Sequence, residues 1–142
     1  MKITVLGSGT SHGIPVIACE CPVCKSKSKF DNRLRSSILV QDEDENILVD
    51  CGPEFRIQAL RCNLKKLDTI LLTHSHADHL HGIDDLRVFA CLSAFKKTEA
   101  KPLEVYGNTD TLKDFKYRFA YLFMPVHQGG GRAMVTLKNT AK

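Results

Sequence analysis

The sequence predicts an α/β fold, in which strands and helices alternate along the chain and pack in layers. Three observations predict it. Along the chain, segments in which apolar residues alternate, as in strands, are interleaved with segments in which they recur every three or four residues, as on one face of a helix. Residues 68–73 form a continuous apolar run, the pattern of a strand buried on both faces. No repeat, low-complexity tract or linker interrupts the 142 residues, so one domain over 1–142 is expected.

The predicted elements follow from short apolar runs and the turn residues between them. The predicted strands are residues 2–6, 37–41, 47–50, 68–73, 103–106 and 133–137. The acidic residues 42–46 separate the second and third strands as a hairpin turn would. Helical spacing of apolar residues predicts helices over 54–62, 80–95 and 111–123, and in the last of these Phe115, Phe119 and Phe123 recur every four residues.

Composition and charge limit the possible functions. The chain is 43% hydrophobic and 25% charged, with a net charge of +4, which permits anionic ligands but is too small for a nucleic-acid footprint. Nucleic acid is therefore not an expected partner. No signal peptide or membrane-spanning run is present, so no membrane association is expected and a cytoplasmic location is predicted. Cysteines stay reduced there, and the six in this sequence are expected to be ligands or core residues before disulfides.

The segment after the predicted strand 68–73 carries the strongest chemical signal. His74, His76, Asp78 and His79 offer three imidazoles and a carboxylate within six residues. These are ligands that Zn²⁺, Mn²⁺ or Fe accept, and a loop at a strand end can bring them together. Four ligands this close cannot all serve one tetrahedral ion that keeps an open position, so two neighbouring metal ions are plausible. The alternative is a polar loop of solvated histidines.

A second cluster consists of three thiols in six residues, Cys19, Cys21 and Cys24. In a reducing compartment this concentration predicts a zinc site. Cysteines two apart rarely reach disulfide geometry without strain, so oxidation is the weaker interpretation. Three thiolates leave one position for a fourth ligand from elsewhere.

The His-x-His-x-Asp-His pattern of residues 74–79, with Asp50 at the end of an earlier strand, resembles the metallo-β-lactamase superfamily. That resemblance implies an αββα sandwich. It also implies that His74 and His76 bind one metal ion and that Asp78 and His79 bind the other. Asp50 would then orient a ligand imidazole from the second shell, as ligating histidines usually require.

The cysteine cluster points to one branch of this superfamily. Together with residues 7–15, 33–37 and 82–87, it resembles the PhnP-type phosphoribosyl cyclic phosphodiesterase branch, in which the cysteines and a late histidine hold a structural zinc. The reaction implied is hydrolysis of a phosphodiester, a small cyclic sugar phosphate, by a hydroxide shared between two Zn²⁺ or Mn²⁺ ions. Asp78 would be catalytic, orienting the nucleophile while it ligates metal.

The sequence departs from this family in its length. Members have two similar halves, and the second brings further His and Asp ligands that are not found here, so the chain resembles an N-terminal half. A half-sandwich exposes the sheet face that its twin would cover, which predicts a homo-oligomer. Two alternatives remain open: a relative of tRNA 3′-processing endonucleases, against which the cysteine cluster counts, and a non-catalytic zinc-binding fragment.

Overall fold

The computed structural model describes residues 1–89, 101–125 and 131–140 and confirms the α/β class. A six-stranded sheet has the order β1-β2-β3-β4-β5-β6. Its strands are β1 (Lys2–Gly7), β2 (Ser37–Asp42), β3 (Glu45–Val49), β4 (Thr69–Leu71), β5 (Leu103–Gly107) and β6 (Val135–Asn139). The helical elements are η1 (Lys29–Asp31), α1 (Phe55–Arg61), α2 (Ala77–Leu80), η2 (Ile83–Leu86), α4 (Thr109–Arg118) and η3 (Ala120–Phe123).

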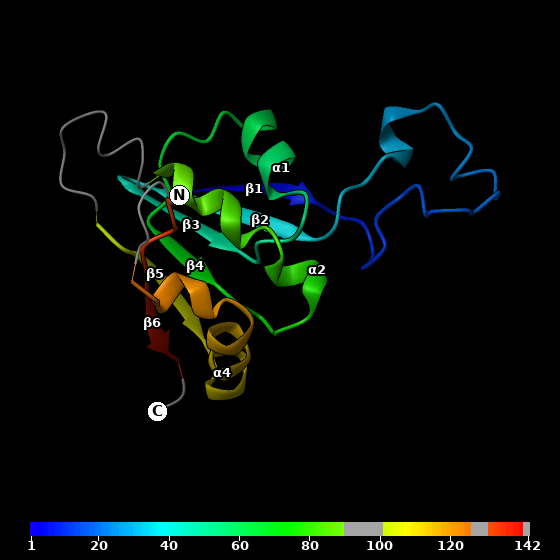
Figure 1. Ribbon diagram of the computed structural model, residues 1–142. Helices are drawn as coiled ribbons and strands as arrows, with labels where there is room; N and C mark the ends of the chain where they lie inside the picture. The colour runs from blue at the N-terminus through cyan, green and yellow to red at the C-terminus, as the bar shows by residue number, and fades with distance from the viewer. Residues whose placement is uncertain (90–100, 126–130, 141–142) are drawn as a thin grey trace.

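The sheet combines an antiparallel and a parallel part. β1, β2 and β3 are antiparallel neighbours, and the predicted hairpin closes with Asp42 opposite Glu45. From β3 to β6 all neighbours are parallel, so the carboxyl ends of β3, β4 and β5 meet at one edge. Figure 1 shows α1, α2 and α4 on one side of this sheet. Loops at the carboxyl edge are therefore positioned by a rigid scaffold.

The covered face of the sheet forms the core. One row of the register runs across the sheet through Leu39, Leu48, Ile70 and Val105, each no more than 1% exposed. The helices supply the opposite side of this core, including Phe55 of α1 and residues of η2 and α4. Helical and sheet residues thus share a single buried layer.

The other face of the sheet is open among the described residues. Ile3 and Val5 of β1 are 59% and 63% exposed, and Ile38 and Leu71 are each 38% exposed. The expectation that the strand at 68–73 is buried on both faces is therefore wrong. Ile70 and Leu72 face the core, whereas Leu71 points to the uncovered side, because successive strand residues alternate between faces.

Two predicted helices are interrupted in the structure. The helix predicted over 80–95 is divided: α2 begins earlier, at Ala77, and η2 follows only after Gly82, while residues 90–95 lie outside the described residues. Gly82 packs so closely that a Cβ there would lie 2.1 Å from the carbonyl oxygen of Gly52. The helix predicted over 111–123 starts at Thr109 and changes to η3 after Phe119. No helix in the described part of the chain is long and apolar enough to cross a membrane.

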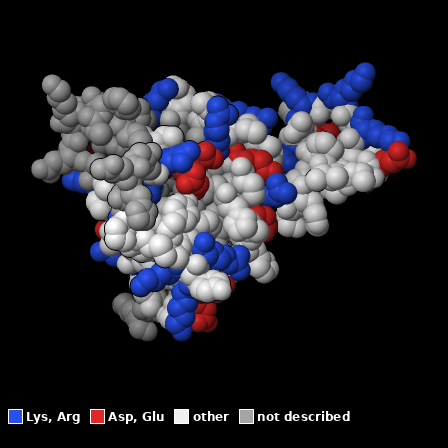
Figure 2. Space-filling view, in the orientation of Figure 1, with Lys and Arg blue, Asp and Glu red and all other residues white. Residues whose placement is uncertain are grey.

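An arm formed by residues 8–36 projects from the sheet between β1 and β2 (Figure 1). Its base is held by reciprocal backbone hydrogen bonds of 2.8 Å between Ile14 and Arg33. Gly9 allows the two sides of the arm's base to approach closely, since a Cβ there would meet the Arg33 carbonyl oxygen at 2.5 Å. Figure 2 shows Lys and Arg side chains on the outer surface of the arm, which carries the exposed Lys25, Lys27 and Lys29.

The core contact of α4 leads to a first prediction. Phe115 is 0% exposed and its ring centroid lies 5.1 Å from that of Phe119. We expect Phe115→Ala to lower the free energy of unfolding by about 3–5 kcal/mol, because it leaves a cavity in the core. Urea denaturation measures the change. Tyr117→Ala is the matched control on the same helix, since Tyr117 is 85% exposed; equal losses in the two variants would contradict the assigned core.

Candidate metal centre

The predicted ligands lie at the carboxyl edge of the sheet. Asp50 directly follows β3, and Thr73 to His76 follow β4, its parallel neighbour. Asp78 and His79 lie in the first turn of α2, so the motif spans a loop and a helix start rather than a loop alone. His76 is the N-cap of α2 with extended backbone angles. The strand end and the helix start together place these side chains within one small region.

Asp50 is the buried anchor of this region. It is 5% exposed and its backbone has φ +60°, a left-handed conformation that few residues other than Gly, Asn and Asp adopt readily. Its Oδ1 accepts a hydrogen bond from the Thr73 backbone N–H at 2.9 Å. Its Oδ2 accepts from the Thr73 hydroxyl at 2.7 Å and pairs with Nδ1 of His79 at 2.6 Å. One carboxylate therefore ties the end of β3 to both parts of the motif.

Backbone hydrogen bonds hold α2 against the segment after β3. The N–H of Cys51 donates to the carbonyl of His79 at 2.8 Å, and the N–H of Gly82 donates to the carbonyl of Cys51 at 2.9 Å. Gly52 is required here by close approach, because a Cβ would lie 2.3 Å from the carbonyl oxygen of Asp78. The position of α2 relative to Asp50 is thus fixed by the main chain.

The hydrogen bonds also determine which imidazole nitrogens face the centre of the motif. The Thr73 hydroxyl gives its proton to Asp50, so at its 3.0 Å contact with His74 Nδ1 it acts as acceptor. This places the proton of His74 on Nδ1, and its Nε2 faces His76. His79 likewise uses Nδ1 toward Asp50, and its Nε2 faces Asp78. Imidazoles oriented in this way through Nδ1 are suited to bind a metal ion through Nε2.

The nitrogen and oxygen atoms that face one another in the motif form two pairs. Nε2 of His74 lies 3.2 Å from Nδ1 of His76, and Nε2 of His79 lies 3.2 Å from Oδ2 of Asp78. Two ligands at the usual zinc distance and tetrahedral angle are separated by about 3.3 Å. The ring centroids of His74 and His79 lie 4.0 Å apart, so the two pairs are adjacent. The donor atoms of each pair are spaced as two ligands of one ion would be.

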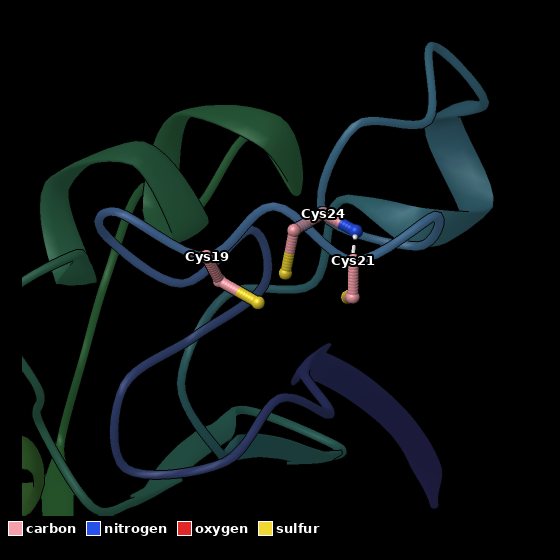
Figure 3. Close-up of side chains that lie close together, drawn as sticks. All are labelled: Cys19, Cys21 and Cys24. Carbon is pink, nitrogen blue, oxygen red and sulfur yellow. Dashed lines mark hydrogen bonds between the residues drawn. The ribbon is translucent and has the colours of Figure 1, made fainter.

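The cysteine cluster lies in the arm, apart from the histidines. Figure 3 shows the side chains of Cys19, Cys21 and Cys24 together in the arm. Their Sγ atoms all lie within 4.8 Å of one another, and in the described part of the chain no other group of three or more His, Cys, Asp or Glu satisfies this criterion. Thiolates bound to one tetrahedral zinc ion are about 3.8 Å apart. All three are free thiols, so the donor set fits a zinc ion.

Backbone N–H groups give the thiols different acidities. The N–H of Cys24 donates to Sγ of Cys21 at 3.4 Å, and this bond, with help from the thiols of Cys19 and Cys24, lowers the pKa of Cys21. The N–H of Val16 donates to Sγ of Cys24 at 3.3 Å and favours its thiolate, but burial and the two neighbouring thiols outweigh that bond and raise the pKa of Cys24. The lowered pKa of Cys21 and the raised pKa of Cys24 make Cys21 the more readily ionised of these two thiols.

Sequence reasoning missed three residues of the histidine region. Thr73 contacts both Asp50 and His74, as described above. Ser75, between the two histidines, donates to Oδ2 of Asp114 on α4 at 2.6 Å. The position of Thr73 at the end of an apolar strand was a usable signal, because strand ends carry functional groups. Nothing in the sequence connects Ser75 with Asp114, which lies 39 residues away.

Comparison with known proteins places this geometry in a family. Residues 45–142 match the model of the β-lactamase superfamily domain. A solved structure described as a new diphosphatase from the PhnP family has a TM-score of 0.83 and 39% sequence identity, covering 98% of this chain and 50% of that one. Zn²⁺-bound PqqB from Methylobacterium extorquens has a TM-score of 0.66 at 21% identity, covering 98% of this chain and 46% of its own, and shows the fold alone.

Curated sequences give further similarities. An octanoyltransferase of Porphyromonas gingivalis is 41% identical over 124 residues, which are 87% of this chain but 24% of that protein. Human zinc phosphodiesterase ELAC protein 1 is 28% identical over 120 residues, 83% of this chain and 28% of its own. The chain thus spans about a quarter of these relatives and half of the PhnP-family diphosphatase. By its match to the domain model and its α/β fold, the chain belongs to the metallo-β-lactamase superfamily.

Proposed function

We propose that this chain provides part of a metal-dependent phosphodiesterase that hydrolyses small cyclic sugar phosphates. The single observation that carries the proposal is the spacing of donor atoms in the segment after β4. His74 and His76 form one pair and Asp78 and His79 form a second, and the two facing atoms of each pair lie 3.2 Å apart. Each spacing is close to the separation of about 3.3 Å between two ligands of one tetrahedral zinc ion, so each pair is spaced to share one cation. The fold class, a metallo-β-lactamase domain, is consistent with hydrolysis.

Each residue of the motif has a distinct part in the proposed centre. His74 and His76 would hold one Zn²⁺ or Mn²⁺ ion through Nε2 and Nδ1, and Asp78 and His79 would hold the second. Bound divalent ions would supply Lewis acidity, which lowers the pKa of coordinated water and offsets phosphate charge. Asp78 would also orient the attacking water. Asp50 would keep His79 in the Nδ1–H form, so that its Nε2 stays available.

The cysteine cluster is proposed as a separate, structural zinc site. Its three thiols lie in the arm, where hydrogen bonds lower the pKa of Cys21, and the three Sγ atoms are close enough to share one ion. The arm has few buried residues of its own. A zinc ion there would replace the hydrophobic core that such a segment lacks.

The choice of substrate rests on chemistry and on the relatives. Two cations side by side match the charge of a phosphoryl group during in-line displacement. The PhnP-family relative is described as a diphosphatase, which also acts on a phosphoryl centre. A second candidate is RNA processing, favoured by the 31% identity over 103 residues with a ribonuclease Z of Borrelia garinii. The third is a zinc-binding unit without turnover.

Metal analysis and activity assays on the purified chain distinguish the three candidate functions. We expect protein purified with Zn²⁺ or Mn²⁺ to retain metal, and to hydrolyse bis(p-nitrophenyl) phosphate and a cyclic sugar phosphate in an EDTA-sensitive reaction. Asp78→Asn should lower kcat by more than about a hundredfold, since it removes a charged ligand. Asp44→Asn, in the exposed turn after β2, is the control. Metal without turnover would favour the zinc-binding unit, and activity on precursor tRNA alone would favour RNA processing.

Asp50 provides a second prediction. Asp50→Asn tolerates the left-handed backbone but loses the charged acceptor that orients His79. We expect about ten- to a hundredfold weaker Zn²⁺ binding, measured by competition with a chromophoric chelator. Asp68→Asn is the matched control, because Asp68 pairs with Lys66 away from the motif. Equal affinities in the two variants would show that Asp50 does not support the metal ligands.

We also propose that copies of this chain associate through the open sheet face. Its exposed Ile3, Val5, Ile38 and Leu71 are apolar neighbours in the register of β1 to β4. Burying such a patch is favourable, and a second copy of the chain offers the same surface.

Light scattering at micromolar concentration tests this association. We expect a dimer or larger species for the wild type and a monomer for Val5→Lys, which places a charge in the patch. Ile57→Lys is the control, because Ile57 is 44% exposed on α1, an element of the other face. A monomeric wild type would refute the proposal.

A further inference from the structure

Ser75 links the histidine motif to α4, a helix to which the proposed function assigns no role. It lies between His74 and His76, and its hydroxyl donates to Oδ2 of Asp114 at 2.6 Å. Asp114 belongs to α4, which follows β5 and is far along the chain from the motif. This is a direct side-chain bond between α4 and the segment that follows β4.

α4 is a firm point of attachment. Asn108 caps its first turn by accepting from the N–H of Thr111 at 2.9 Å, and Thr111 is buried. Phe115, the residue after Asp114, is fully buried in the core. Asp114 itself stays partly exposed and makes a 3.7 Å contact with Arg118 one turn later. The helix therefore holds the carboxylate in place without depending on the motif.

The contacts of His76 show why this bond matters. Among the described residues, its imidazole hydrogen-bonds to His74 alone, whereas His74 and His79 are also restrained by Thr73 or Asp50. His76 has extended backbone angles, φ −66° and ψ 152°. Ser75 lies between the two histidines, so a bond that holds its side chain against α4 restrains the backbone that carries both His74 and His76.

We propose that Asp114 is a positioning residue for the His74–His76 pair and acts through the Ser75 hydroxyl. The proposal rests on the metal site put forward above. The Ser75–Asp114 bond fixes the rotation of the segment, so that Nε2 of His74 and Nδ1 of His76 stay 3.2 Å apart, ready to share one divalent cation. Without the bond, the pair must be ordered when the cation binds, which weakens binding.

Co²⁺ titration of the whole chain provides the test, with Co²⁺ alone as the probe. Both sites give visible d–d absorption, but only the cysteine site adds a thiolate charge-transfer band. The d–d absorption of the histidine motif is therefore followed in a parallel background in which Cys19, Cys21 and Cys24 are replaced by Ser. We expect Asp114→Ala to weaken Co²⁺ binding at the histidine motif about tenfold and to leave the thiolate band unchanged. Asp114→Asn keeps an acceptor for Ser75 and should recover affinity to within about twofold of wild type.

Two controls separate positioning from a general effect on α4. Asp110→Ala removes a carboxylate one turn earlier, which pairs with Lys113 at 3.8 Å, and this variant should bind Co²⁺ as the wild type does. Arg118→Gln, which removes the other partner of Asp114, should also leave the affinity unchanged. Thermal unfolding of each variant by circular dichroism checks that the fold is retained.

A double variant tests the route through Ser75. If Asp114 acts through this hydroxyl, Ser75→Ala should cost about the same tenfold, and Ser75→Ala with Asp114→Ala should cost no more than either alone. Losses that multiply, or an Asp114→Ala protein that binds Co²⁺ like Asp110→Ala, would overturn the proposal. A wild type without d–d absorption at the motif would instead overturn the metal site itself, and this inference with it.

Discussion

The bonds made by the Asp50 carboxylate are the constraint on which the site depends. Asp50 follows β3, accepts from Thr73 at the end of β4 and pairs with His79 on α2, so three elements meet at two oxygen atoms. A buried carboxylate is stable only when its hydrogen-bonding capacity is used, and here both oxygens are used. The left-handed backbone at Asp50 turns the carboxylate toward the motif, which makes a strained residue part of the site's construction.

The sheet supports the histidine motif and Asp50 through packing on its helix-covered face only. The row from Leu39 to Val105 packs against the helices and holds β3, β4 and β5 in register, so that the loops at their carboxyl ends start from fixed points. The opposite face contributes nothing to this packing among the described residues. The site is thus built on the buried face, while the exposed face leaves room for another polypeptide surface.

Much of the fold could be predicted from the sequence, because strand alternation and helix spacing reflect burial directly. The hairpin at 42–46 and the helix at 54–62 are examples in which local pattern and tertiary structure agree. The interruption at Gly82 could not be predicted, since its cause is the close approach of Gly52 from another element. The histidines and Asp50 are visible as residue types, but the bond from Ser75 to Asp114 exists only after folding.

The placement of Asp78 and His79 on α2 has a consequence for chain length. α2 is fixed at its far end, where Gly82 bonds to Cys51 and leaves no space for a side chain. An α-helix turns by about 100° per residue. A single insertion or deletion between His79 and Gly82 would therefore rotate His79 away from Asp50 even if every residue of the motif were retained. The number of residues between His79 and Gly82 is therefore as important to the geometry of the motif as the identity of the residues.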